Sequence, residues 1–244
     1  MKNYPNLKFV INKKKELETF LNFYSWSKHQ KKNRDLNWAI YKPHPKLRRI
    51  KKKSLLEQKI FIHKYIDNFY KQNINEIKNG VLKAKKDWKK VEKDFFILVD
   101  EIFKEYPWPN GKYIAYSTIW GMYPRYLNSK TFLFPYSHNK KNYILIVIAH
   151  EMLHFMFYDY VYTKFSKLKS QKYNFVLWNM SEIFNAVIQN SKKWISVFHQ
   201  KTMGYPEHKK HISKFKKYWQ ESKNIDIWIK KSFDYLKNSK PLTF

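Results

Sequence analysis

A long apolar stretch in the middle of the chain, Tyr143 to Tyr162, sets the strongest limit on how this sequence can fold. It holds no lysine or arginine, although 49 of the 244 residues are Lys or Arg. Apart from tyrosines, its ionisable residues are His150, Glu151, His154 and Asp159. Because the stretch is longer than a strand and lacks Gly and Pro, it predicts a buried helix from about Asn142 to Tyr162. The ionisable residues and the lack of further such stretches argue against a membrane span, so we expect no membrane association.

Inside this stretch, residues 150–154 have the sequence His-Glu-Met-Leu-His. Residues four apart on a helix project from the same face, so both imidazoles can bind one metal ion while Glu151 lies beside it. The spacing is the HExxH pattern, in which two histidines hold zinc and the glutamate acts as a general base. The alternative is a core helix whose two histidines are hydrogen-bonded inside the protein, which is the usual explanation for a single buried histidine.

A third protein ligand must be a nitrogen or oxygen donor, because the chain contains no cysteine. We choose Glu182, on a helix predicted from Asn174 to Asn190. Its apolar stripe is Met180, Ile183, Phe184, Val187 and Ile188. Glu182 points roughly the other way, where a solvated or ion-paired glutamate would also lie. However, no Lys or Arg occurs between Lys172 and Lys192, so we expect packing on both sides of this helix. A buried carboxylate then needs a partner such as a metal ion.

With these residues, the chain resembles the gluzincin branch of zincin metallopeptidases over about residues 112–190. The resemblance implies an α+β, zincin-like fold, mostly helical, with a small sheet preceding the HExxH helix. It also implies zinc-dependent hydrolysis of peptide bonds, with zinc (Zn2+) held by His150, His154 and Glu182 and with a peptide or protein as substrate. Glu151 would be the general base for the metal-activated water and would return the proton to the leaving amine. A deformylase-like amide hydrolase shares HExxH, but its usual cysteine ligand is absent here.

Other site residues follow less directly from the resemblance. The strand expected at Thr131 to Phe134 would form the edge of the cleft that pairs with an extended peptide. The acidic residue that often supports a ligand histidine, four positions after the ligand glutamate, is replaced by Ala186. The candidates for stabilising the transition-state oxyanion are Tyr158, His199, His208 and His211. We expect Asp159 to be structural, and we interpret His29, His44, His63 and His138 as ordinary surface or core residues.

The formal net charge of +30 supports a second hypothesis. Positive charge is spread along the whole chain, which a composition biased towards AT-rich codons largely explains. One segment stands out, because Lys28 to Lys53 holds 11 basic residues against the single Asp35, together with Trp38 and Tyr41. The alternative function is therefore a basic nucleic-acid-binding protein with a structural or inactive zinc site. Such binding would be weak and sequence-independent, through phosphate contacts.

The positions of prolines and the changes in charge along the chain predict three regions. These are a basic, mostly helical region at 1–106, a zincin-like catalytic core at 107–200 and a helical, exposed region at 201–244. The remaining elements expected are a helix at Lys13 to Tyr24, a helix from a capping box at Ser54-Leu55-Leu56-Glu57 to about Asn79, a further helix after Gly80 to about Tyr106, and a strand at Lys112 to Tyr116. The N-terminal residues lack the apolar stretch of a secretory signal, so we expect a cytoplasmic protein.

Overall fold

The computed structural model describes residues 3–29 and 36–239, which form helices and one small mixed sheet, as expected of an α+β protein. The chain divides into two compact units. Unit 1 comprises Met1–Pro5, Trp88–Gly111 and Lys141–Phe244, and unit 2 comprises Asn6–Asp87 and Lys112–Lys140. Each unit therefore combines segments that are far apart in the sequence.

Unit 2 contains the four-stranded sheet, in the order β1 (Lys8–Val10), β2 (Ile114–Thr118), β4 (Thr131–Pro135) and β3 (Arg125–Tyr126). The pairs β1–β2 and β2–β4 are parallel, and β3–β4 is antiparallel. The expected strand at Thr131 to Phe134 is confirmed as β4, whereas β2 begins two residues later than predicted. Strands β1 and β3 were not predicted from the sequence, because they are too short for an alternating pattern to be recognised.

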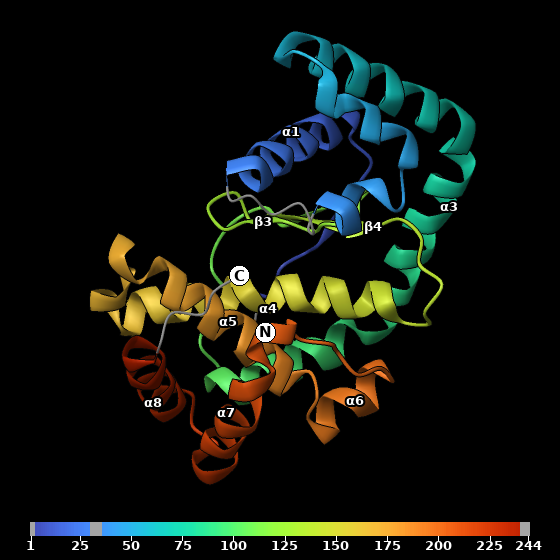
Figure 1. Ribbon diagram of the computed structural model, residues 1–244. Coiled ribbons are helices and arrows are strands. Elements are labelled where there is room, and N and C mark those ends of the chain that lie inside the picture. The colour runs from blue at the N-terminus through green and yellow to red at the C-terminus, as the bar shows by residue number, and fades with distance from the viewer. Residues whose placement is uncertain (1–2, 30–35, 240–244) are drawn as a thin grey trace. The chain divides into compact units, whose positions relative to one another are not determined.

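Helix α1 (Lys13–His29) lies along one face of this sheet (Figure 1) and is longer than the helix predicted there. Its Phe20 packs against Trp120, with ring centroids 5.2 Å apart. Two short elements follow, the π-helix η1 (Asn37–Tyr41) and the 3-10 helix η2 (Pro45–Lys52). Their buried residues join α1 and the first part of α3 in the apolar core of unit 2.

Helix α3 (Leu55–Phe103) is continuous, which corrects the predicted break at Gly80. Its start is as predicted, because the Ser54 amide donates to Glu57 Oε2 at 2.8 Å and the Glu57 amide donates to Ser54 Oγ at 3.4 Å. A Cβ at Gly80 would overlap the carbonyl oxygen of Tyr136. The glycine thus allows a close backbone contact inside the helix and does not end it.

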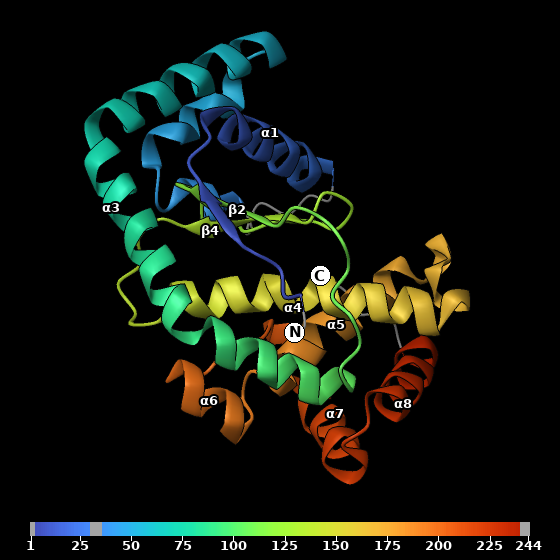
Figure 2. The same cartoon turned by 180° about the vertical axis from the view of Figure 1, so that it is seen from behind.

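Unit 1 is built on α4 (Tyr143–Lys164) and α5 (Asn174–Ile188), which pack against each other (Figure 2). Both helices were expected, with ends within two residues of those observed. The pair is antiparallel, because Tyr158 contacts Ser181 whereas Ile146 contacts Gln189. Helix α4 is long and apolar enough to span a membrane, but 83% of its most apolar window is buried. It is therefore the core helix that the sequence predicted.

The C-terminal part of unit 1 is helical, as expected, but it is not simply exposed. It begins with α6 (Lys192–Phe198), and after a short loop α7 (Lys209–Ser222) and α8 (Ile225–Asn238) pack on α5. Trp228 of α8 is fully buried against Phe184 of α5, with ring centroids 5.0 Å apart. Many side chains of residues 201–239 are exposed, but those that face α5 are buried, because α5 has apolar side chains on two faces and α7 and α8 cover the one that α4 leaves open.

Candidate metal centre

Helices α4 and α5 bring three potential metal ligands together inside unit 1. His150 Nε2 lies 3.0 Å from His154 Nε2 and 3.1 Å from Glu182 Oε2. His154 Nε2 lies 3.4 Å from Glu182 Oε1. The three side chains were chosen as ligands from the sequence, and they form the one group of at least three His, Cys, Asp or Glu ligand atoms found together within the described residues.

The spacing of these atoms fits a zinc ion. Zinc binds imidazole nitrogen and carboxylate oxygen at about 2.0–2.2 Å, and tetrahedral angles then place neighbouring ligand atoms about 3.3 Å apart. The observed separations of 3.0, 3.1 and 3.4 Å lie around this value. Two imidazoles and one carboxylate are also a donor set that zinc prefers and that a cysteine-free chain can supply.

Most of this cluster is buried, so its members must satisfy one another. The side chains of His154 and Glu182 are 0% and 4% exposed, and that of His150 is 22% exposed. Burial by itself would lower the pKa of His150, but the hydrogen bond to Glu182 and the charges of Glu182 and Glu151 outweigh it and raise that pKa. A carboxylate facing two acceptor nitrogens is satisfied when a proton or a metal ion lies between them.

Gln189 holds His150 in an orientation suited to metal binding. Its Oε1 lies 3.0 Å from His150 Nδ1, and its Nε2 donates to the carbonyl oxygen of Ile146 at 3.2 Å. The second bond fixes which way the amide faces, so the oxygen accepts from Nδ1–H and the lone pair of Nε2 points to Glu182 and His154. Asn185 Nδ2 also donates to the His150 carbonyl at 3.0 Å. Gln189 was not predicted as a site residue from the sequence, although its position two helical turns after Glu182 was the available signal.

Glu151 and Asp159, the two carboxylates of α4, have different surroundings. Glu151 is 5% exposed, and its charge acts on the neighbouring His150. Asp159 accepts a hydrogen bond from the Tyr106 hydroxyl at 3.0 Å and is not part of the ligand cluster. This contact agrees with the structural role expected for Asp159.

The four candidates for oxyanion stabilisation separate into two groups. Tyr158 lies one turn after His154, with ring centroids 6.2 Å apart, and its hydroxyl accepts from Ser181 Oγ at 3.2 Å. His208 is buried, and its Nε2 lies 2.8 Å from Asn179 Oδ1. The charge of Glu182 acts on the His208 imidazole. The other two candidates are placed differently. His211 is hydrogen-bonded to Tyr235, and His199 is an exposed residue at the end of α6.

No protein-family model, curated protein or solved structure matches this chain. In the centre itself, two imidazole nitrogens and a carboxylate converge beside a second buried carboxylate. That arrangement can hold a divalent cation and place a proton acceptor next to it.

The remaining histidines have ordinary surroundings. His44 is buried between the Tyr65 hydroxyl, 2.8 Å from Nδ1, and the Ile119 carbonyl, 2.7 Å from Nε2. Burial lowers the pKa of His44. His63 is exposed and pairs with Asp67 at 3.1 Å, and His138 is also exposed. The side chain of His29 lies outside the described part of the chain.

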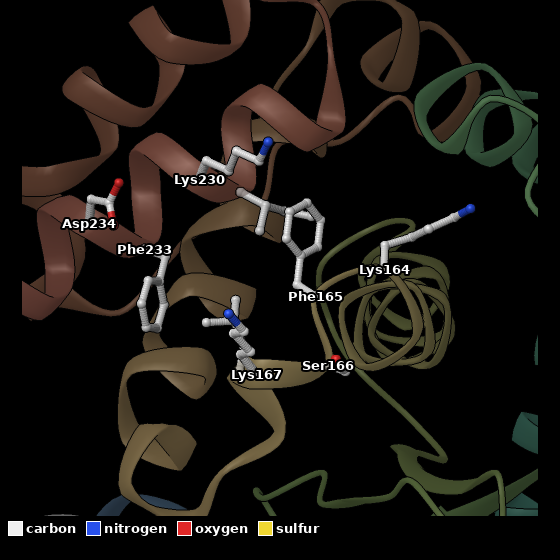
Figure 3. A pocket seen from close by; sticks show the side chains of 9 residues that line it. Lys164, Phe165, Ser166, Lys167, Lys230, Phe233 and Asp234 are labelled. Carbon is white, nitrogen blue, oxygen red and sulfur yellow. The ribbon is translucent and has the colours of Figure 1, made fainter.

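A surface pocket of about 360 Å³ lies elsewhere in unit 1, where the end of α4 meets η3 (Ser166–Lys169) and α8 (Figure 3). Its lining residues are Lys164, Phe165, Ser166, Lys167, Leu168, Ile229, Lys230, Phe233 and Asp234. None of them belongs to the metal cluster. Lys164 lies roughly 15 Å along α4 from His154, by the rise of a helix. The pocket is therefore separate from the candidate centre.

Proposed function

We propose that this protein is a zinc-dependent metallopeptidase of zincin-like architecture. The observation that carries the proposal is the convergence of His150, His154 and Glu182 at one buried point, with the buried Glu151 next in the chain to His150. Three N/O ligands in the described residues suit a catalytic zinc, because structural zinc sites are usually closed by four protein ligands.

The chain's own residues have distinct roles in this proposal. Zinc, when bound, supplies a Lewis acid that polarises a substrate carbonyl and lowers the pKa of a water molecule. Glu151 accepts a proton from the attacking water and later delivers it to the leaving amine. Gln189 accepts a hydrogen bond from Nδ1–H of His150. The neutral ring then has its lone pair on Nε2, the nitrogen that faces Glu182. The low exposure of Glu151 and Glu182 keeps bulk water from weakening these interactions.

The test compares two carboxylates of the same helix in zinc-loaded protein. Glu151→Gln keeps the side-chain shape but cannot accept a proton, so we expect near-stoichiometric zinc and a loss of hydrolysis of about 10²- to 10⁴-fold. The matched control is Asp159→Asn, which alters a carboxylate outside the cluster and should keep zinc and activity. The measurements are zinc per chain by mass spectrometry and release of labelled fragments from an unfolded protein substrate.

Two results would contradict the peptidase proposal. One is a wild-type protein that holds zinc at one ion per chain and cleaves no peptide bond. The other is a Glu151→Gln protein that is as active as wild type, because its activity would not use this site.

A second candidate function, nucleic-acid binding, is favoured by the arrangement of η2. Every third residue around this 3-10 helix is buried, namely His44, Leu47 and Ile50. The residues that flank them are exposed, and four are cations: Lys46, Arg48, Arg49 and Lys51. Within the described residues these four cations pair with no carboxylate.

Two features of this basic surface, defined as Lys46, Arg48, Arg49 and Lys51, suit a single-stranded nucleic acid. The chain has only four arginines, and two of them are adjacent on this surface. Their guanidinium groups can bind phosphate through bidentate hydrogen bonds. Arg48 Nη2 donates to Asn37 Oδ1 at 3.3 Å, beside Trp38, which is 60% exposed and can stack on a base. Residues 30–35 of the predicted basic segment lie outside the described residues.

The test of this second function is the salt dependence of binding to oligothymidylate. Replacing Arg48 and Arg49 by Gln should flatten the plot of log affinity against log salt by about 1.4 units, since each phosphate contact contributes about 0.7 for single strands. Lys89→Gln is the control, because Lys89 already pairs with Glu92 at 2.5 Å. An unchanged slope would rule out this surface, and zinc content should not change in either variant.

A further inference from the structure

Rows of aromatic side chains lead away from the metal cluster on both helices that form it. On α5, Trp178 lies one turn and Phe175 two turns before Glu182, on the same face. On α4, Tyr158 lies one turn after His154, and its ring is 6.2 Å from the imidazole. Because the two helices are antiparallel, both rows run in the same direction from the cluster.

The row on α5 is extended by the loop that follows α6. Trp178 stacks on Phe175 with centroids 6.4 Å apart and contacts the ring of Tyr205 at 5.4 Å. The Tyr205 ring in turn lies 5.5 Å from His208, whose surroundings include the charge of Glu182. We call Phe175, Trp178 and Tyr205 the aromatic surface.

The loop that carries Tyr205 is tied to α5. Asn190 Nδ2 donates to the carbonyl oxygens of Ala186 at 2.7 Å and Thr202 at 3.1 Å. A Cβ at Gly204 would lie 3.2 Å from Ala186 Cβ, so glycine permits the loop to approach the helix closely. Tyr205 is therefore positioned by the fold before any ligand arrives, which limits the entropy lost on binding.

The exposure of these rings is unusual for this protein. Phe175 and Tyr205 are each 45% exposed, and the adjacent Met203 is 85% exposed, whereas most large aromatic side chains of unit 1 are buried. A contiguous exposed apolar patch costs solubility and commonly marks a binding site. This one continues directly from the ligand Glu182 along α5.

We propose that the aromatic surface is the specificity subsite of the enzyme and receives a large apolar side chain, aromatic or aliphatic, of the peptide substrate. The proposal rests on the peptidase function proposed above. Trp178 and Phe175 lie about 6 and about 10 Å along α5 from Glu182, by the helix rise. Successive residues of an extended peptide are about 3.4 Å apart, so the bound side chain belongs to a residue within about three positions of the cleaved bond.

The first experiment measures selectivity with two matched peptides that differ only in Phe or Ala near the scissile bond. Wild type should prefer Phe in kcat/KM by roughly tenfold or more, which is typical of an apolar subsite. Phe175→Ala and Tyr205→Ala should remove most of that preference while keeping zinc content. Both residues are 45% exposed, so their truncation should leave the fold intact. The control is Trp26→Ala in unit 2, a ring that is 44% exposed.

A second experiment, independent of turnover, measures binding of the same fluorescein-labelled peptides to zinc-loaded Glu151→Gln protein by anisotropy. We expect the Phe peptide to bind roughly tenfold tighter than the Ala peptide, and the Phe175→Ala change to abolish the difference. Equal binding of both peptides to Glu151→Gln, or a Phe preference that survives both Phe175→Ala and Tyr205→Ala, would overturn the subsite.

The cleavage and binding experiments together distinguish failure of the peptidase proposal from failure of the subsite proposal. If wild type cleaves no peptide but the Phe preference in binding depends on Phe175, the peptidase function fails and the aromatic surface stands as a peptide-recognition surface. If wild type cleaves peptides with no preference for Phe over Ala, the peptidase stands and the subsite fails.

Discussion

Glu16 in unit 2 and Glu182 in unit 1 are both buried carboxylates, but they are surrounded by opposite kinds of atoms. In unit 2, Glu16 of α1 accepts hydrogen bonds from Thr118 Oγ1 at 2.7 Å, the Tyr70 hydroxyl at 2.9 Å and the Ile119 amide at 3.0 Å. In unit 1, Glu182 of α5 faces imidazole nitrogens of His150 and His154 at 3.1 and 3.4 Å. The exposed fractions are similar, 1% for Glu16 and 4% for Glu182.

The difference shows that burial alone does not identify a functional carboxylate. Glu16 meets neutral donors that the protein supplies, and burial raises its pKa to about 7 despite those hydrogen bonds. It can be satisfied as a neutral acid inside the fold. Glu182 meets nitrogens that are acceptors unless protonated, and we propose that a metal ion between these atoms completes the cluster. The predictions below test this contrast.

The largest expected effect is loss of zinc when the cluster is broken. Glu182→Ala and His154→Ala should each reduce bound zinc from about one ion per chain to a small fraction, because two ligands hold the ion poorly. Zinc at 100 times its Kd should stabilise the wild type by about 2.7 kcal/mol and these variants hardly at all. Zinc analysis and calorimetry with and without a chelator measure both. Glu16→Gln, the control, should bind zinc like wild type, and a Glu182→Ala protein with unchanged affinity would remove Glu182 as a ligand.

The second effect is a pH dependence of stability that comes from Glu16. The folded pKa of Glu16 is about 7 against an ordinary 4.5, so between these pH values the folded state keeps a proton that the unfolded state has lost. The free energy of unfolding should therefore fall as pH rises from 4.5 to 7, by about 3 kcal/mol in order of magnitude, and show no further change from this group above pH 7. Urea denaturation at several pH values measures this.

In Glu16→Gln, which cannot ionise, that contribution should vanish, so the variant should gain stability relative to wild type as pH rises. A wild-type minus variant difference that stays constant between pH 4.5 and 7 would show that Glu16 does not have a raised pKa.

The third effect concerns the support of His150. Gln189→Leu should weaken zinc binding by about 10- to 100-fold, as removal of a hydrogen bond to a ligand histidine typically does. Gln189→Glu, which keeps an oxygen acceptor for Nδ1–H, should recover most of the loss. Zinc titration gives the affinities, and nitrogen NMR of the zinc-free protein reports whether His150 changes tautomer. If Gln189→Leu binds zinc as tightly as wild type does, Gln189 has only a packing role and does not orient His150 for metal binding.

The smallest effect is loss of one donor to Glu16. Tyr70→Phe removes the hydroxyl that donates to Glu16 Oε1 at 2.9 Å and should cost about 1 kcal/mol of unfolding free energy at pH 5, where Glu16 is neutral. The cost should increase at pH 8, because a hydrogen bond to a charged group is worth more. Equal costs at both pH values would mean that Glu16 does not change its charge in that interval.

Local patterns predicted the elements on which the candidate site depends. The apolar stretch without Lys or Arg before Lys164 predicted α4, and the stretch without them between Lys172 and Lys192 predicted α5. The Ser54–Glu57 pair predicted the start of α3. These signals are carried by residues adjacent in the chain. They failed where the partner is distant, as at Gly80, whose neighbour is Tyr136.

The sequence by itself determined the register of His150 and His154, because the helical repeat places residues four apart on one face whatever the rest of the chain does. It also indicated Glu182 as a ligand, because the absence of Lys and Arg from the predicted helix implied that its carboxylate is buried. Only the tertiary structure decided that Gln189 orients His150 and that Thr118 and Tyr70 satisfy Glu16. These contacts join residues 39 to 102 positions apart, and local periodicity carries no information about which distant segments will pack together.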